Sequence, residues 1–351
     1  MSAQLEEHLE QPGSTGSRFE SDEGQDRALR RWRRLAVGAA ASTFALIVLG
    51  GVVRITGSGM GCGADWPLCN GKLVPSPDLP TLIEFGHRVA AAAVSLLVLA
   101  LAAHAWLPGR GATWRGRRRL ALWAVGLLAI QVMLGAVAVR WELPPATVVL
   151  HLGTAMLFLG LLVAGSCFGR SDRPAPMRGF FEEAGVPSTA TAAPDRAAGV
   201  AWLTAGLGLL VVLAGALVAN LDAARACQGF PLCNGEWWPG DNWRMQLHWG
   251  HRMAAYGLAA WALALPSFVR RVRPGDGASF GAARSAAGLA GGQIAVGAAM
   301  VLLSLPGWLR ALHVALGSAL FASLVATAWL VGRREPVRRV TQRAEPGRAV
   351  G

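Results

Sequence analysis

Long apolar runs alternate with short polar segments through most of this chain. Eight of the runs are each about long enough to cross the ~30 Å hydrocarbon core of a bilayer, since a helix rises ~1.5 Å per residue. The pattern predicts an all-α polytopic membrane protein with eight transmembrane helices. The expected helices cover residues 35–53, 82–107, 120–139, 145–169, 197–221, 247–269, 285–305 and 309–332.

Positive charge then suggests the orientation of these helices. The 351 residues include 33 Lys and Arg against 21 Asp and Glu, a net charge of +12 that would also suit a nucleic-acid binder. However, 25 of the positive residues lie in the two tails and in every second connection, and 8 lie on the opposite side. Cytoplasmic flanks of membrane helices are enriched in Lys and Arg. We therefore expect both termini in the cytoplasm, a lipid bilayer around the chain and no nucleic-acid partner.

The polar segments divide the chain into five parts. We expect a disordered cytoplasmic tail over residues 1–34, because this segment is polar. An N-terminal four-helix half over 35–169 follows, and then a cytoplasmic linker over 170–196. A C-terminal four-helix half over 197–332 and a cytoplasmic tail over 333–351 complete the chain.

The two halves share short motifs at a nearly constant spacing. Trp-Pro-Leu-Cys-Asn-Gly at 66–71 returns as Phe-Pro-Leu-Cys-Asn-Gly at 230–235, and Gly-His-Arg at 86–88 returns at 250–252, both 164 residues later. Because each half holds four helices, both halves enter the membrane from the same side. The repeat is therefore parallel, about an axis along the membrane normal. Further matches, at an offset of 162, join Gln131 to Gln293, Gly135 to Gly297 and His151 to His313.

Four of the seven histidines occupy repeat-matched positions inside helices: His87, His151, His251 and His313. A proline stands seven residues before three of them, so each lies about 10 Å along its helix from the outer edge of the membrane. Ionisable residues within a bilayer are costly and usually functional. Two facing imidazoles at one depth are what a six-coordinate haem iron needs. We expect haem ligation rather than a hydrogen-bonded helix contact, or a zinc or copper site, for which no further ligand lies nearby in sequence.

The residues around these histidines differ between the halves. Arg88 and Arg252 follow a ligand candidate and are candidates to pair with haem propionates. Glu84 stands one turn before His87, whereas the matching residue of the second half is His248. The carboxylate of Glu84 could orient a substrate, relay a proton or stabilise a cation; the alternative is an interfacial charge paired with Arg88 or a helix cap. His248 is either an alternative ligand or an interfacial side chain.

Four of the five cysteines lie in two long extracytoplasmic loops. That side of a bacterial membrane permits disulfides. The simplest of three connectivities pairs Cys62 with Cys69 and Cys227 with Cys233. Redox shuttling, or transient contact with a metal or substrate, is the alternative role for these cysteines.

The third helix of each half contains one glutamine, and the two glutamines occupy matched positions. Gln131 and Gln293 are expected to form hydrogen bonds between helices. The alternative is that both side chains line a haem pocket.

Taken together, these motifs resemble the haem A synthase family of cytochrome oxidase assembly. The resemblance covers residues 35–332, and the two cysteine pairs are similar to those of the Gram-positive branch, in which they form disulfides. His248 and the shorter second cysteine loop depart from the family pattern, and the adjacent Arg252 favours His251 as the ligand. The shared motifs are Thr-Gly-Ser-Gly at 56–59, the stretch 62–73, Glu-Phe-Gly-His-Arg at 84–88, and the residues His151, His251, Arg252 and His313.

The resemblance implies an oxidoreductase. Such an enzyme oxidises a methyl group of haem O to a formyl group by successive hydroxylations, and the haem A product goes to cytochrome oxidase. The N-terminal half would bind substrate haem O through His87 and His151, with Glu84 as the catalytic residue. The C-terminal half would hold the iron of a low-spin haem b cofactor through His251 and His313.

The resemblance also implies a cellular setting. It places the chain in a bacterial plasma membrane, with the haem sites toward the extracytoplasmic side. The implied partners are a haem O synthase, a cytochrome oxidase assembly factor or subunit, and an electron donor that the sequence does not identify. Homo-oligomerisation stays open.

A non-catalytic membrane dihaem b-type electron carrier is the main alternative function. Identical histidine pairs would serve such a carrier equally well. It does not explain Glu84, because a symmetrical electron carrier needs no carboxylate in one half alone.

Overall fold

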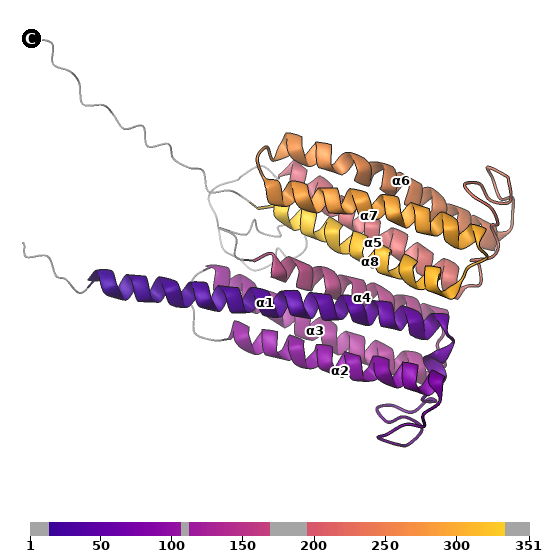
Figure 1. The fold of residues 1–351 in the computed structure, drawn as a ribbon, viewed down its shortest axis with the longest axis horizontal. Helices are drawn as coiled ribbons and strands as arrows, with labels where there is room; N and C mark the ends of the chain where they lie inside the picture. Colours follow the sequence, from indigo (N-terminus) through magenta and orange to yellow (C-terminus); the bar gives the residue numbers. More distant parts are fainter. Residues whose placement is uncertain (1–13, 107–111, 169–194, 334–351) are drawn as a thin grey trace, which may run out of the picture.

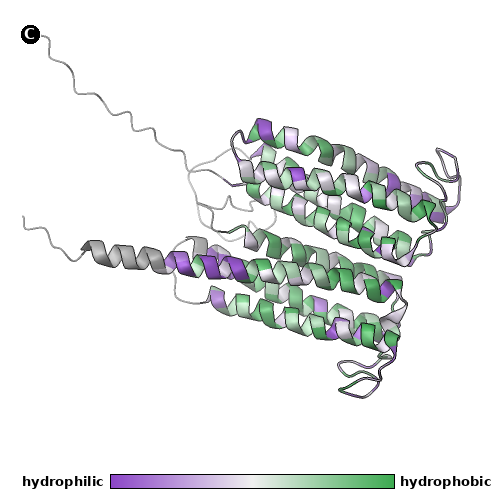
Figure 2. Ribbon diagram, viewed as in Figure 1, coloured by the Kyte–Doolittle hydropathy of each residue, from purple (hydrophilic) through white to green (hydrophobic). Residues whose placement is uncertain are grey.

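The computed structural model describes residues 14–106, 112–168 and 195–333. Eight helices within this part of the chain are long and apolar enough to cross a membrane. Figure 2 shows hydrophobic residues along the middle of these helices and hydrophilic residues near their ends. The predicted all-α, multi-pass membrane class is confirmed. The helices are α1 (Ser14–Ile55), α2 (Leu79–Ala105), α3 (Ala112–Arg140), α4 (Pro145–Ser166), α5 (Arg196–Asn220), α6 (Trp243–Val272), α7 (Gly277–Leu302) and α8 (Gly307–Val331).

Several helices extend beyond the apolar runs that predicted them. α3 begins at Ala112 rather than 120, and α7 at Gly277 rather than 285, because charged residues end an apolar run without ending a helix. The largest correction concerns α1, which begins at Ser14 inside the tail expected to be disordered over 1–34. Asp26 stands four residues before Arg30, a spacing that stabilises a helix in water. Residues 1–13, 107–111, 169–194 and 334–351, with the predictions made for them, lie outside the described residues.

Polar residues fix where four of the helices begin. The Asp78 carboxylate accepts the backbone N–H of Thr81 at 3.1 Å at the start of α2. Hydrogen bonds from Ser76 and Thr81 hold the pKa of the Asp78 carboxyl below its usual value. The first N–H groups of a helix have no carbonyl partner within the helix, and a side chain that accepts one of them stabilises the first turn. The same capping role is taken by Asp195 in α5, Asn242 in α6 and Asp276 in α7.

The same tight turn ends α3 and α7. Leu143 and Leu305 carry positive φ angles of 62° and 65°, which non-glycine residues seldom adopt. Each donates its backbone N–H to the carbonyl five residues earlier, at 2.7 Å. The next residue, Pro144 or Pro306, is the N-cap of α4 or α8. The turn therefore sets the starting point of two histidine-bearing helices.

Each half is a closed ring of four helices. α1 and α3 both contact α2 and α4, and α5 and α7 both contact α6 and α8. α2 and α4 are therefore diagonal partners across one ring, as α6 and α8 are across the other. The rings lie side by side, with the connections 56–78 and 221–242 at the same end (Figure 1). Because each connection holds a disulfide, we call this end the disulfide end. A parallel repeat requires this arrangement.

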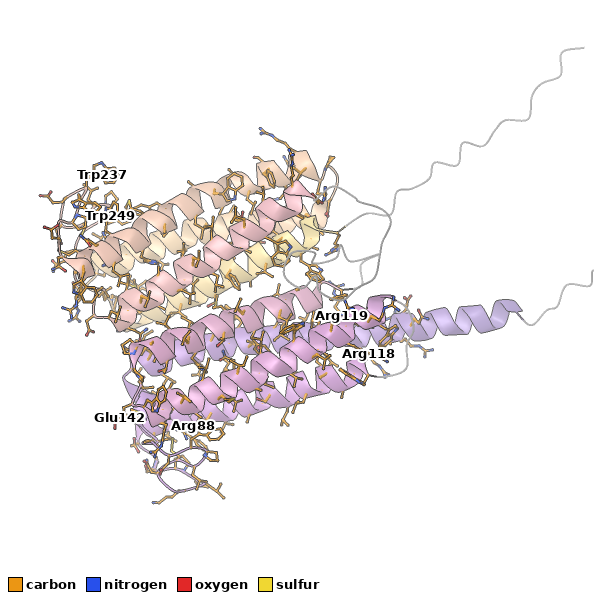
Figure 3. The ribbon with its side chains drawn as sticks, turned by 180° about the vertical axis from the view of Figure 1, so that it is seen from behind. Arg88, Arg118, Arg119, Glu142, Trp237 and Trp249 are labelled. Atoms are coloured by element: carbon orange, nitrogen blue, oxygen red, sulfur yellow. A yellow bond between two sulfur atoms is a disulfide. The ribbon has the colours of Figure 1, made fainter. Side chains whose placement is uncertain are left out.

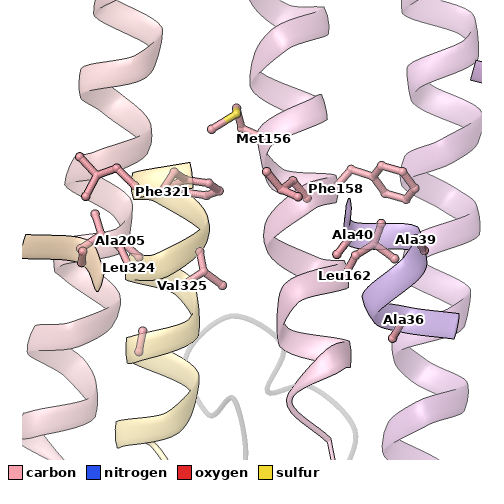
Figure 4. Close-up of a cluster of buried hydrophobic side chains, with 14 of the residues drawn as sticks. Ala36, Ala39, Ala40, Met156, Phe158, Leu162, Ala205, Phe321, Leu324 and Val325 are labelled. Carbon is pink, nitrogen blue, oxygen red and sulfur yellow. The ribbon is translucent and has the colours of Figure 1, made fainter. Parts of the chain in front are cut away.

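The two rings meet along α4 and α8, with further contacts from α1 to α8 and from α4 to α5. Gly160 of α4 allows the approach, because a Cβ atom there would lie 3.3 Å from Phe321 and 3.4 Å from Val325 of α8. Buried side chains fill both sides of this contact (Figure 4). On the other side of α4, Phe158 and Leu162 lie near small alanines of α1. This packing holds the histidine-bearing helices α4 and α8 together at the centre of the molecule.

Candidate functional site

In each half, one histidine of the second helix packs against a glycine of the first helix. A Cβ atom at Gly50 of α1 would lie 3.1 Å from Cε1 of His87 in α2. In the second half, a Cβ atom at Gly215 of α5 would lie 2.8 Å from Cε1 of His251 in α6. Real Cβ atoms rarely approach so closely in a packed interior, so each glycine makes room for an imidazole ring.

The other two histidines also lie against a glycine, on the third helix of each half, although at a less crowded distance. A Cβ atom at Gly135 of α3 would lie 3.4 Å from Cε1 of His151 in α4. The distance is again 3.4 Å from Gly297 of α7 to His313 in α8. At all four predicted ligand positions, the imidazole therefore lies against a glycine of a neighbouring helix. We call the two histidines on the diagonal helices of one half, together with their glycines, a histidine cradle. Each half has one.

The protein leaves these imidazoles with unused hydrogen-bonding groups. In all four histidines, Nδ1 is buried and has no hydrogen-bond partner. The side chains of His87 and His151 are close enough to interact electrostatically, and so are those of His313 and His251. A buried ring nitrogen without a partner is unfavourable. Rings so placed on diagonal helices fit axial ligation of a haem iron in each half.

A compact metal site built from protein ligands is a different arrangement. Within residues 14–106, 112–168 and 195–333, no group of three or more His, Cys, Asp and Glu side chains could hold a metal ion. Axial ligation of haem needs only two histidines, because the macrocycle supplies the other four ligands.

Glu84 connects the first disulfide loop to the helix that carries His87. Only 3% of Glu84 is exposed. Its Oε2 accepts the backbone N–H of Cys62 at 2.8 Å, and its Oε1 pairs with Arg88 Nη2 at 2.6 Å. The pairing with Arg88 that was the alternative to a catalytic role is therefore present. It does not exclude that role, because Glu84 lies one turn from His87 on the same helix.

Arg88 holds the first loop against α2. Its Nη1 donates to the carbonyl oxygens of Asp65 at 2.9 Å and Leu68 at 2.8 Å, in addition to the two bonds to Glu84. Figure 3 shows Arg88 beside the loop at the disulfide end. Most of its N–H groups are thus taken by the protein, and pairing with a haem propionate stays a prediction.

The second half replaces the carboxylate with a different set of bonds. Arg252 donates to the carbonyl oxygens of Gly229, Leu232 and Cys227 at 3.0, 2.8 and 2.9 Å. His248, at the position matching Glu84, is 5% exposed, and its Nδ1 lies 3.1 Å from the carbonyl oxygen of Ala223. His248 is therefore bonded to the backbone, consistent with the interfacial interpretation. The pairing of Arg252 with a propionate also stays a prediction.

Both predicted disulfides are present, Cys62–Cys69 and Cys227–Cys233. An asparagine braces each loop from inside: Asn70 donates to Gly61 O at 3.1 Å, and Asn234 donates to Ala226 O at 3.2 Å. The loops are thus built alike, although only the first receives a carboxylate from the helix below it.

The two glutamines form the interhelical hydrogen bonds expected of them. Gln131 donates to the carbonyl oxygen of His151 at 2.9 Å and also contacts the hydroxyl of Thr154. Gln293 donates to the carbonyl oxygen of His313 at 3.1 Å, and its Nε2 lies 3.2 Å from the imidazole Nε2 of that residue. Each glutamine therefore braces the backbone of the helix that carries a histidine.

Two cradle residues were missed by the sequence analysis. Gly50 and Gly215 lie 165 positions apart, close to the repeat offset. That spacing could have identified them, as it identified Gly135 and Gly297. The helix around Gly50 is rich in glycine and alanine, so nothing else marks that position.

Comparison with known proteins places this architecture in a family. Residues 33–325 match the family model described as cytochrome oxidase assembly protein. The chain is 33% identical to Heme A synthase of Symbiobacterium thermophilum over 271 residues, 77% of this chain and 85% of that protein. It is 32% identical to Heme A synthase of Alkalihalophilus pseudofirmus over 243 residues, 66% of this chain and 75% of that protein.

Proposed function

The chain belongs to the cytochrome oxidase assembly protein family, and from that membership we propose that it is a haem A synthase. It oxidises one methyl substituent of haem O to a formyl group, in successive hydroxylations that end with loss of water. The observation that carries the proposal is the pair of histidine cradles, of which only one has a carboxylate a turn away. An electron carrier would need the cradles but not the carboxylate.

The N-terminal half binds the substrate in this proposal. His87 and His151 hold the iron of haem O, since both imidazoles lie on diagonal helices with Nδ1 unpaired. Gly50 and Gly135 keep the two rings in place. The porphyrin then lies within one ring of helices, below the first disulfide loop.

Glu84 is the catalytic residue of this proposal. Conversion of a methyl to a formyl group breaks two C–H bonds of the substrate, so a group that moves protons close to the ring assists each step. Arg88 and the backbone N–H of Cys62 hold the carboxylate in one position. Because these partners hold the carboxylate in place before substrate arrives, Glu84 loses little freedom when the reaction begins.

The C-terminal half holds the cofactor. His251 and His313 would hold the iron of a haem b, and that haem would supply electron transfer. Arg252 fastens the second loop over this half, where no carboxylate takes the place of Glu84. An iron held by two histidines, without a nearby acid, suits electron transfer rather than oxidation of the ring.

The remaining proposals concern the setting. The chain lies in a bacterial plasma membrane with both termini in the cytoplasm and the disulfide end toward the extracytoplasmic side. A haem O synthase supplies its substrate, and a cytochrome oxidase subunit or assembly factor receives its product. The oxidant is dioxygen: in each hydroxylation one oxygen atom enters a C–H bond, and the other leaves as water with two protons and with two electrons from a separate reductant.

The test is to produce the full chain together with a haem O synthase in a host that makes no haem A of its own. Non-covalent haems are extracted and identified by mass spectrometry. We expect haem A in cells with the wild-type chain and none in cells with the His87→Ala or His151→Ala variant. If reductant is supplied and only haem b and haem O are found with the wild type, the chain is an electron carrier and the proposal is wrong.

A further inference from the structure

A second polar cluster lies inside the N-terminal half, at the end opposite the disulfide loops. His104 belongs to the last turn of α2, and Arg117 to the second turn of α3. Only 9% of His104 and 3% of Arg117 is exposed. His104 follows His87 by 17 positions, or about 25 Å along the helix, so the cluster cannot belong to the histidine cradle.

Four nitrogen atoms of this cluster lack a hydrogen-bond partner among the described residues. Both ring nitrogens of His104, and Nε and Nη1 of Arg117, are buried without a hydrogen-bond partner. Among the described residues, Arg117 takes part in neither the Arg88–Glu84 ion pair nor the Arg273–Asp195 ion pair. A buried guanidinium that lacks an acceptor is strongly unfavourable, because it has lost its hydration without replacement.

Two tryptophans form the walls of the cluster. The guanidinium carbon of Arg117 lies 4.3 Å from the ring centroid of Trp114 and 6.0 Å from that of Trp32. Trp32 lies 6.4 Å from the His104 ring, and its indole N–H donates to Gly165 O at 3.0 Å. Aromatic faces stabilise the flat side of a guanidinium. They leave the N–H groups in its plane directed at an acceptor that the protein does not supply.

The surroundings of the cluster are strongly positive. Arg118 lies at the same end of the bundle (Figure 3), and it donates to Ala105 O at 3.3 Å. Basic pockets between membrane helices at the bilayer surface attract the headgroups of anionic lipids. Further arginines on the adjacent part of α1 are Arg30, Arg31, Arg33 and Arg34.

The C-terminal half has no such cluster at the matching positions. Phe268 takes the place of His104, and Ser279 that of Arg117. Phe268 packs against Trp261 at 5.8 Å, and the Ser279 hydroxyl is bonded to Asp276. The unpaired donors are therefore not a general feature of the four-helix ring.

We propose that His104 and Arg117 bind the phosphate group of an anionic ligand, between α2 and α3 at the end of the N-terminal half opposite the loops. Arg117 donates Nε–H and Nη1–H to two phosphate oxygens, a geometry that a guanidinium favours, and His104 donates a ring N–H to a third. An anionic phospholipid and free phosphate share this chemistry. The experiment separates the two sources.

The test uses the full chain, purified in detergent and washed free of lipid. Thermal unfolding is followed as dioleoylphosphatidylglycerol, dioleoylphosphatidylcholine or sodium phosphate is added. Arg117→Gln removes the proposed ligand, and Arg119→Gln removes an exposed charge from the same helix as a matched control. We expect phosphatidylglycerol to raise the Tm of the wild type and of Arg119→Gln, with at least about tenfold weaker apparent affinity in Arg117→Gln.

The changes in Tm distinguish the two sources of the phosphate group. Stabilisation by phosphatidylglycerol alone that depends on Arg117 assigns a lipid headgroup, and an equal Arg117-dependent response to sodium phosphate assigns a free anion. Equal responses of Arg117→Gln and Arg119→Gln, or none in the wild type, overturn the proposal. Should Arg117→Gln fail to fold, His104→Phe introduces the residue of the other half and keeps the arginine. It should weaken phosphatidylglycerol binding several-fold, and unchanged binding would also overturn the proposal.

Discussion

The two halves of this chain share one scaffold and a few matched motifs, but they differ at a position beside those motifs. Both hold glycine-backed histidines on diagonal helices, a braced disulfide loop and a glutamine bonded to a histidine carbonyl. They differ most at one position of the second helix. There Glu84 accepts the N–H of Cys62 in the first half, and His248 lies against Ala223 O in the second.

Under the proposed function, this comparison separates haem ligation from reaction. The cradle occurs in both halves and is assigned to ligation. The Glu84 carboxylate has no counterpart at the matching position and is assigned to the reaction proposed for the N-terminal half. A duplicated bundle can thus acquire a catalytic and an electron-transfer half without any change in helix arrangement.

The largest effect is expected from the carboxylate itself. Glu84→Gln should lower haem A formation about 10²-fold or more, because proton transfer in the transition state contributes rate enhancements of that order. The spectrum of bound haem b should not change. The matched control is His248→Gln, which alters the corresponding position of the other half and should leave most of the conversion. Mass spectrometry of extracted haems measures both, and retained conversion in Glu84→Gln would exclude a catalytic role.

The next largest effect is expected from the cradle. Gly215→Ala would place a Cβ atom 2.8 Å from His251. Overpacking of about 1–3 kcal/mol corresponds to a roughly 5- to 150-fold loss of haem b affinity. Gly206→Ala in the same helix is the control, because a Cβ atom there meets nothing within 4 Å. Equal haem b content in both variants would show that the glycine does not hold the ring.

A smaller effect, which differs between the two halves, is expected from the disulfides. The double change Cys62→Ser with Cys69→Ser loosens the loop whose N–H binds Glu84, and should lower conversion about tenfold by loss of one positioning hydrogen bond. Haem b content should stay the same. The change Cys227→Ser with Cys233→Ser should instead weaken haem b retention, because Arg252 binds Cys227 O. Identical consequences of the two double changes would count against the division between halves.

The smallest effect is expected from the glutamines. Gln293→Ala removes the bond to the His313 carbonyl at 3.1 Å. Interhelical hydrogen bonds in membranes contribute about 0.6–2 kcal/mol, so the temperature at which haem b is lost should fall by a few degrees. Gln131→Ala should not change that temperature, since its partner His151 belongs to the substrate half. An equal shift in both variants would mean that the bonds stabilise the bundle as a whole.

The sequence predicted the features that repeat and missed those that depend on packing. The eight helices, the histidine positions and both disulfides followed from hydropathy, spacing and compartment. The hydrogen bond from the Cys62 N–H to Glu84 could not be predicted from the sequence. It joins a backbone group to a distant side chain, and the sequence does not determine the shape of the loop between them. The start of α1 at Ser14 was missed because a charged segment can form a helix although its hydropathy is low.

The division of labour between the halves is tested most directly by measuring low-spin haem b in two variants of the full chain, His87→Ala and His251→Ala, produced without haem O. The account predicts that His251→Ala loses the low-spin haem b spectrum and that His87→Ala retains it at the wild-type content per chain. If His87→Ala lost the haem b spectrum and His251→Ala retained it, the assignment of substrate and cofactor to the two halves would be contradicted.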